Sequence, residues 1–429
     1  MNAATPRGTD EPGTRLMDLA VFAAAFAVYT GLAFATGEYL SEADSDARFL
    51  GAKWALDHPS FLLDPWHKPV MTTLMAGVIL FGGAAVGVKL VQAALAAAAL
   101  ALVRAAALRF GAKEREALLA VAIAGLAPFW VRGVASGLTE ISCALFLAAA
   151  LYLWSREKFA WSALATSFAF LARFDAIFFW IAWTPFLIRK RSWAGLACLP
   201  VAPLLWHLAG WAATGNAQFL FAQQPHPWGA SHYGSGPWWT FFALLPVAAG
   251  ALLVPAACGV KRAPPITPAV CASVVAGHTI LWTVGILGSY GMPRYLVTMI
   301  PALAVCAAFG FESVRGLARP ALLAVAIGCA GFAAWYRPNS YLGARQLATG
   351  RGLMTDHSTI ARIQGGDWVR IDQWQSAPAG TLLTWATSPG GNESFDSIPR
   401  ERLQFEGSIV MPPEWPWEKP WEGRIYRLK

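Results

Sequence analysis

The sequence is poor in charged residues for its length. Lys, Arg, Asp and Glu make up only 14% of the 429 residues, and hydrophobic residues make up 56%. An ordinary soluble domain carries about a quarter charged residues. This composition therefore excludes a soluble domain and indicates a membrane protein that crosses the bilayer several times.

Cysteine is also scarce where a disulfide framework would need it. The six cysteines all lie in or beside apolar runs, and none lies in a long polar loop. We expect them to be small packing residues. A cleavable signal peptide is not expected either, because the first apolar run, 16–36, is long for a signal and lacks a clear small-residue cleavage site. The net charge of +8 comes largely from short basic clusters between apolar runs, so it does not point to nucleic acid.

The apolar runs predict an all-α polytopic membrane domain over 16–336 with about 11 transmembrane helices. Several runs are shorter than the roughly 20 residues of a full crossing. Basic clusters occupy every second gap and are placed in the cytoplasm by the positive-inside rule. The loop 37–69 and the C-terminus then lie outside and the N-terminus inside, provided that 69–103 crosses an odd number of times.

The two ends of the chain differ from this membrane domain. Residues 1–15 are polar and are expected to form a disordered cytoplasmic tail. Residues 337–429 are polar and rich in Gly, Pro and Trp. They contain T-L-L-T-W-A-T and R-I-Y-R-L, which predict short strands. We therefore expect a small mixed or β-rich extracytoplasmic domain.

The loop 37–69 concentrates acids and bases between two apolar runs. A helix is predicted from Asp46 to Leu56, capped by Asp44 or Ser45 and ended by His58-Pro59. The acids then either cap this helix or include a general base for a hydroxyl substrate. Asp44 and Asp46 would share a face of an extended chain but diverge by about 200° in a helix. We therefore expect one to be catalytic and the other structural.

The second half of the loop, Asp64 to Pro69, leads into the next apolar run. Asp64, His67 and Lys68 are placed at the membrane surface, where they either anchor the chain or contact a substrate. A divalent-metal site made by Asp57, His58, Asp64 and His67 is an alternative, but the spacing matches no specific ligand pattern.

Charged residues beside later spans are further candidates, because ionisable groups at membrane depth are costly. Glu140 either caps a helix with Thr139 or belongs to a site. Arg173 either pairs with Asp175 or binds phosphate. Arg294, after Gly291-Met292-Pro293, is expected to bind a lipid phosphate. His207 and His278 are expected in the core, and the loop 214–237 either covers a site or forms ordinary surface.

Five stretches, in order over roughly 16–310, resemble the GT-C superfamily. These are polytopic glycosyltransferases that use polyprenyl-phosphate sugars, including protein O-mannosyltransferases and aminoarabinose lipid A transferases. The stretches are D-S-D-A-R-F-L-G-A-K-W-A-L, H-K-P-V-M-T-T-L, S-G-L-T-E-I-S-C-A-L-F-L, F-L-A-R-F-D-A-I-F-F-W and G-M-P-R-Y-L-V-T-M-I-P-A-L. The chain departs from the family at three places. It has Ser45-Asp46, preceded by Asp44, where Asp-Glu is common, Lys68 in place of a proline, and Arg173-Phe174 where Arg-Pro is frequent.

The resemblance implies sugar transfer from a polyprenyl-phosphate donor to an acceptor on the outer face of the bacterial plasma membrane. The reaction would be inverting and, as in most branches, independent of metal, with no cofactor. It implies Asp46 as base, with Asp44 as the second candidate. The residues it implies for the substrate and phosphate are Arg294, Arg173, Lys68, His67, Asp64, Glu140 and Tyr295. The alternatives are a transporter of lipid-linked sugars or a non-catalytic assembly subunit. The sugar and the acceptor do not follow from the sequence.

Overall fold

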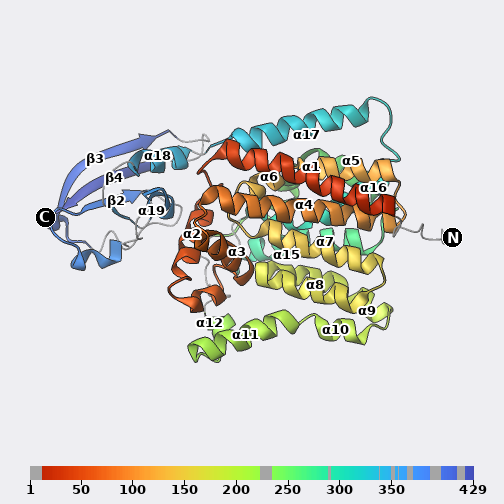
Figure 1. Cartoon of the computed structure of the whole chain (residues 1–429), viewed down its shortest axis with the longest axis horizontal. Coiled ribbons are helices and arrows are strands. Elements are labelled where there is room, and N and C mark those ends of the chain that lie inside the picture. Colours follow the sequence, from red (N-terminus) through yellow and green to blue (C-terminus); the bar gives the residue numbers. More distant parts are fainter. Residues whose placement is uncertain are drawn as a thin grey trace.

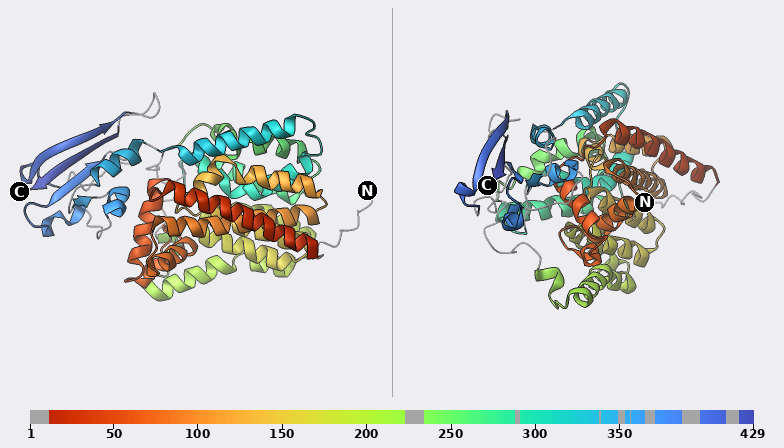
Figure 2. Two further views of the ribbon diagram at one scale, coloured as in Figure 1. Left: turned by 45° about the horizontal axis from the view of Figure 1, so that its top comes forward. Right: turned by 60° about the vertical axis from the view of Figure 1, so that its left-hand side comes forward.

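The computed structural model consists of a long helical bundle with a small sheet at one end (Figure 1). It describes residues 12–222, 234–287, 291–337, 339–348, 353–355, 357–364, 371–386, 398–412 and 421–429. The expected tail 1–15 lies mostly outside these residues, as does the part of the loop 214–237 between 223 and 233. Figure 2 shows the sheet beyond the end of the bundle.

The bundle is built around one long, alanine-rich helix, α4 (Ala85–Arg109), against which α1 (Pro12–Thr36) and α7 (Glu140–Ser155) pack. Buried small side chains such as Ala93, Ala96 and Ala99 allow close helix approach. The other bundle helices are α5 (Glu114–Gly125), α6 (Pro128–Val134), α8 (Phe159–Ala172), α9 (Ile177–Arg189), α10 (Trp193–Cys198), α11 (Val201–Thr214), α12 (Phe219–Ala222), α13 (Thr240–Ala249), α14 (Leu253–Gly259), α15 (Ile266–Val284), α16 (Ile300–Gly310) and α17 (Ala318–Trp335). Short 3₁₀ turns join several of them: η2 (Phe174–Ala176), η3 (Gly250–Leu252) and η4 (Pro293–Met299).

The bundle confirms a multi-pass membrane protein. Within the described part of the chain, seven helical stretches are long and apolar enough to cross a membrane. An eighth span results if α5 and α6, bent by 65°, are counted as one. The count of about 11 stays a prediction, because α7, α8 and α3 (Pro69–Leu80) are apolar but shorter. The 12 residues of α3 extend only about 18 Å, so α4 is the span-length helix of the segment 69–103.

The loop 37–69 folds at the end of the bundle that faces the sheet (Figure 1). It forms α2 (Ala43–Trp54) and η1 (Pro59–Leu63) before α3. The predicted N-cap was wrong, since α2 begins at Ala43 and Glu42 occupies the cap position with φ 78°. That left-handed conformation is uncommon for a residue other than glycine. Asp44 and Asp46 therefore both lie in the first turn of the helix.

The C-terminal region is a four-stranded sheet with helices, as predicted for a small mixed region. Strands β1 (Leu353–Thr355) and β2 (Leu382–Ala386) pair in parallel, and β4 (Trp421–Leu428) pairs antiparallel with both β2 and β3 (Leu403–Met411). The two strands expected from sequence are β2 and β4. The region also contains α18 (Asn339–Leu347), α19 (Ser358–Gln364), η5 (Ile371–Ser376) and η6 (Arg400–Arg402). Helix α19 packs on α2 and so joins this region to the loop.

Candidate functional site

The central contact of the site joins the loop to a distant turn of the bundle. Arg294 Nη2 donates to Asp44 Oδ2 at 2.6 Å, across 250 residues of sequence. Arg294 lies in η4, directly after Pro293, and its Nη1 is 3.6 Å from Glu42 Oε2. The Asp44 side chain is 42% exposed and that of Arg294 only 11% exposed. Asp44 is therefore the solvent-facing member of this pair.

A chain of alternating charges continues inward from Arg294. Glu140, at the start of α7, is buried and accepts a 2.6 Å hydrogen bond from Arg173 Nη1, while the same oxygen is 3.9 Å from Arg294 Nε. Arg173 also donates hydrogen bonds from Nε and Nη2 to the Asp175 carboxylate, each at 2.9 Å. His278 Nε2 lies 3.2 Å from Asp175. Buried charges are tolerated only when they are paired in this way.

Tyr295 lies beside both guanidinium groups of this chain. Its ring centroid is 5.2 Å from the Arg173 guanidinium carbon and 5.7 Å from that of Arg294, within the range of cation–π contacts. His278 stacks on the Tyr295 ring at 5.2 Å and is buried, as expected for a core histidine. The aromatic ring therefore keeps the two arginines next to each other.

Two further cations come from the loop. Lys68 has a φ of 70°, a strained value for a residue other than glycine. Its Nζ lies 3.6 Å from the centre of the Phe174 ring and donates a hydrogen bond to the Pro65 carbonyl. Burial, together with the Arg48 and Arg173 guanidiniums, lowers the pKa of Lys68 well below its ordinary value. Arg48 donates to the carbonyl oxygens of Trp66 and His67 at 2.7 and 2.5 Å.

Arg48 is a site residue that the sequence reasoning missed. It lies four residues after Asp44 in α2, so the two share a helix face. That spacing was the available signal. Burial alone would raise the pKa of the Asp44 carboxyl, but Arg294, Arg48 and Arg173 lower it by more, so the net shift is downward. Asp44 is therefore held as a carboxylate.

Asp64 and His67 bind each other and shape the loop. Asp64 Oδ1 accepts from the backbone N–H groups of Trp66 and His67, both at 2.9 Å, and lies 2.8 Å from His67 Nδ1. The His67 ring packs so tightly on Gly51 that a Cβ there would come within 2.2 Å of it. Among the described residues, those of the alternative metal set with Asp57 and His58 included, no group of three His, Cys, Asp or Glu side chains is placed to hold a metal.

Asp46, the first candidate for the base, points away from this cluster. Its side chain is 1% exposed, and its Oδ2 accepts a 2.6 Å hydrogen bond from Thr359 while Oδ1 accepts from Arg362 Nε. Both partners belong to α19 of the C-terminal region. Burial raises the pKa of Asp46 in spite of these partners. Asp44, and not Asp46, is thus the loop carboxylate that contacts Arg294 and faces solvent.

Comparison with known proteins identifies solved structures with a similar fold. No protein-family model matches the sequence, and no curated protein matches it. The crystal structure of ArnT from Cupriavidus metallidurans bound to undecaprenyl phosphate is similar over 98% of this chain and 98% of its own, with a TM-score of 0.65 and 12% sequence identity. The chain has the ArnT fold. The structure of ArnT in the apo state gives a TM-score of 0.64 and 13% identity over 97% of this chain and 98% of that one. The expected GT-C-like fold is confirmed as a fold similar to that of ArnT.

Proposed function

We propose that this protein is a membrane glycosyltransferase that moves a sugar from a polyprenyl-phosphate donor to an acceptor at the outer face of the bacterial plasma membrane. The observation that carries the proposal is the contact of Asp44 with Arg294, which places a carboxylate beside a group suited to phosphate. The ArnT fold, and the binding of undecaprenyl phosphate by one of the ArnT structures, support this class of donor.

The donor phosphate is assigned to the guanidinium groups of Arg294, Arg48 and Arg173. Guanidinium pairs well with phosphate oxygens, and fixed cations stabilise charge that develops on a leaving group. The Nε–H groups of Arg294 and Arg48 are buried and have no hydrogen-bond partner among the described residues, so each retains a donor for a ligand. A bound phosphate would favour the charged form of Lys68 and so oppose the effect of burial, which lowers the pKa of this lysine.

In the proposed reaction an acceptor hydroxyl attacks the anomeric carbon of the sugar, and the bond from that carbon to the phosphate oxygen breaks. Asp44 accepts the hydroxyl proton and Arg294 binds the departing polyprenyl phosphate. The phosphate and Asp44 compete for Arg294, since that guanidinium now contacts the carboxylate at 2.6 Å. Donor binding therefore weakens the attraction of Arg294 that lowers the pKa of Asp44. The pKa of Asp44 then rises, and Asp44 becomes a stronger base.

The proposed orientation in the membrane is supported by basic residues that meet at the opposite end of the bundle. Lys113 and Arg262 lie 3.1 and 3.8 Å from Glu312, so gaps that are far apart in sequence meet there. By the positive-inside rule that end is cytoplasmic. The N-terminus then lies inside. Helix α2, the C-terminal region and the group formed by Asp44, Arg294, Glu140 and Arg173, called here the Asp44 cluster, lie outside.

The test uses the purified protein in liposomes with a panel of undecaprenyl-phosphate sugars, labelled in the sugar. Fractions of bacterial lipid, protein and glycan are supplied as acceptors. We expect label to appear in one acceptor class together with released undecaprenyl phosphate. Movement of label between leaflets with no product would instead support the transporter. Neither product nor movement with any donor would support a non-catalytic subunit.

A further inference from the structure

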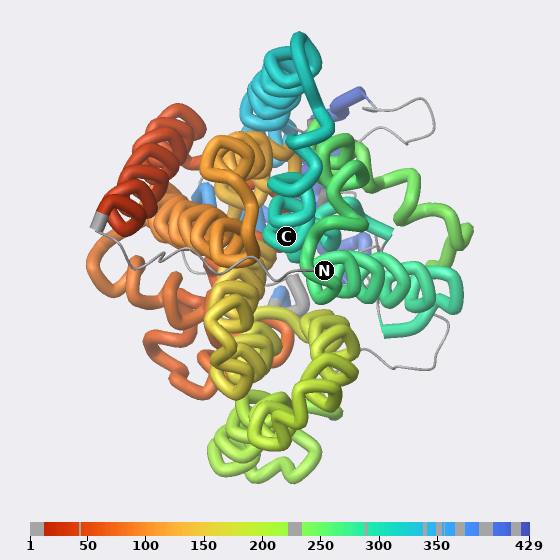
Figure 3. Tube along the Cα trace, turned by 90° about the vertical axis from the view of Figure 1, so that its right-hand side faces the viewer, coloured from red at the N-terminus to blue at the C-terminus, as the bar shows by residue number. Residues whose placement is uncertain are grey.

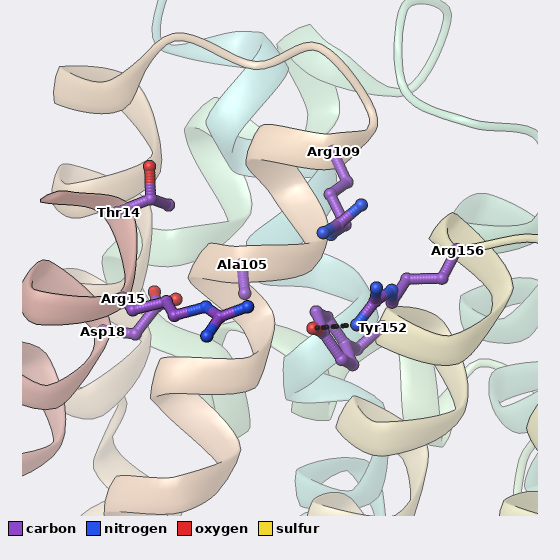
Figure 4. Close-up of a pocket in the computed structure, with 7 residues that line it drawn as sticks. All are labelled: Thr14, Arg15, Asp18, Ala105, Arg109, Tyr152 and Arg156. Carbon is purple, nitrogen blue, oxygen red and sulfur yellow. Dashed lines mark hydrogen bonds between the residues drawn. The ribbon is translucent and has the colours of Figure 1, made fainter. Parts of the chain in front are cut away.

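A cavity of about 190 Å³, drawn close up in Figure 4, lies at the N-terminal end of α1, and Figure 1 shows that end of the bundle away from the sheet. It is lined by Thr14, Arg15 and Asp18 of α1, Ala105 and Arg109 of α4, and Tyr152 and Arg156 at the end of α7. Figure 3, which looks along the bundle from this end, shows these three helices side by side, coloured red, orange and yellow.

The cavity lies on the membrane face opposite to the candidate site. Helix α7 begins with Glu140 at the site and has 16 residues, so its end lies about 24 Å away along the helix axis. That length approaches the roughly 30 Å thickness of the hydrocarbon core. The Asp44 cluster and this cavity therefore cannot share one ligand headgroup, and the cavity needs an explanation of its own.

The lining of the cavity is suited to an anion. Three arginines and one acidic residue, Asp18, line the cavity. The charge of Asp18 is already offset by the buried Arg104, whose Nη1 donates to it and whose Nε also binds Glu114 at 3.0 Å.

Tyr152 brings two of the cavity arginines together. The guanidinium carbons of Arg109 and Arg156 both lie 5.8 Å from its ring centroid. Arg156 Nη1 donates to the phenol oxygen at 3.3 Å, and the phenol O–H remains a donor. The cavity therefore brings guanidinium groups, a group type suited to phosphate, beside a neutral hydroxyl donor.

The size and surroundings of the cavity restrict the ligand. Pockets for drug-sized molecules usually measure about 300–1,000 Å³, so this cavity suits a smaller group such as a phosphate headgroup. Arg15 and Asp18 are three residues apart and share the face of α1 that lines it. The next residues along, Leu16 and Leu19, are 69% and 65% exposed and provide apolar surface for acyl chains directly beside the cavity.

We propose that this cavity binds the phosphate of an anionic phospholipid from the cytoplasmic leaflet. The phosphate would contact Arg15, Arg109 and Arg156 and so hold the ends of α1, α4 and α7 together. Basic pockets between spans on the cytoplasmic side are a recurring type of lipid site. The ligand is distinct from the donor lipid of the proposed transferase reaction; the choice of leaflet rests on the proposed orientation, but the site does not depend on that reaction.

The experiment compares the full-length protein in nanodiscs of phosphatidylcholine alone with nanodiscs that also contain phosphatidylglycerol. Unfolding temperature and, by native mass spectrometry, retained lipid are measured. We expect phosphatidylglycerol to raise the unfolding temperature and one molecule to be retained. The variant Arg109→Gln/Arg156→Gln should lose both effects. The control Arg189→Gln/Lys190→Gln removes two exposed charges from the C-terminal end of α9, outside the cavity, and should keep them.

Three results would overturn the proposal. The first is the absence of a shift with phosphatidylglycerol, and the second is an equal loss in the control variant, which would indicate attraction to surface charge in general. The third is an equal shift with inorganic phosphate alone, which would indicate a site for a free anion. If Arg109→Gln/Arg156→Gln does not fold in phosphatidylcholine, Arg109→Lys/Arg156→Lys keeps the charge but loses the two-donor geometry. It should retain less lipid, and undiminished retention would contradict the proposal.

Discussion

Asp44 and Asp46 are two residues apart in α2 and bind partners from different parts of the molecule. Asp44 contacts Arg294 in the membrane bundle, and Asp46 contacts Arg362 in the C-terminal region. Residues two apart in a helix diverge by about 200°, so α2 presents one carboxylate to each side. The helix therefore links the docking of the C-terminal region to the position of the candidate base.

Replacing Asp46 should loosen the C-terminal region. In Asp46→Ala the buried Arg362 loses its main partner, and removing one member of a buried ion pair costs about 3–5 kcal/mol. We expect a lower unfolding temperature and faster proteolysis within 337–429. The double variant Asp46→Ala/Arg362→Met should recover much of the loss, because it leaves no unpaired charge.

The exposed Asp57 provides a matched control for that change, and Asp57→Ala should behave like the wild-type protein. Equal protease resistance of Asp46→Ala and the wild-type protein would show that the contact with Arg362 does not hold the region in place.

Replacing Arg294 should shift the pH dependence of the reaction. Arg294 is the strongest of the groups that lower the pKa of Asp44, which is ordinarily near 3.8. A base must be unprotonated, so the wild-type rate should show no acid limb from Asp44 at pH 5 and above. In Arg294→Gln burial still acts on Asp44 without this attraction, so its pKa rises and an acid limb moves to higher pH.

Arg294→Lys keeps a positive charge and should move the limb less than Arg294→Gln does. The pH profile of kcat/KM for the donor, which reports the donor-free protein of each variant, provides the comparison. A residual activity in Arg294→Gln with the wild-type profile would mean that Asp44 is not the titrating base.

Removal of divalent metal should leave the transfer rate unchanged. The proposal assigns the charge of the donor phosphate to Arg294, Arg48 and Arg173, and the described residues offer no set of three metal-ligating side chains in one place. Initial rates with and without a chelator test this. A rate that falls on chelation and returns with added Mg²⁺ or Mn²⁺ would contradict it.

The sequence pointed to several residues that the structure brings together, but it did not distinguish the surroundings of Asp44 from those of Asp46. Ionisable residues at membrane depth are costly, so Glu140, Arg173 and Arg294 stood out, and the structure brings them together with Tyr295. The role of Asp46 depended on a partner in α19, in a region to which the resemblance did not extend. The phase of α2 also depended on a start at Ala43, where no side-chain cap marks the helix end.

The number of transmembrane helices could not be predicted from the sequence for a different reason. Helices α3, α7 and α8 are apolar but have only 12, 16 and 14 residues, so apolar composition does not decide whether each crosses the bilayer. The strands β2 and β4 were predictable because β-branched and aromatic residues stand in short runs there. Strand β1, with only three residues, carries no such pattern.

The most direct test of the account is the transfer rate of Asp44→Asn from a polyprenyl-phosphate sugar, measured beside Asp46→Asn in the same liposomes. A general base contributes about 10²–10⁴-fold, so Asp44→Asn should lose that much in kcat while donor binding is no weaker than in the wild type, because Asp44 no longer competes for Arg294. Asp46→Asn should lower the unfolding temperature but leave the kcat of the folded protein close to that of the wild type. A wild-type kcat in Asp44→Asn would contradict the assignment of Asp44 as the base.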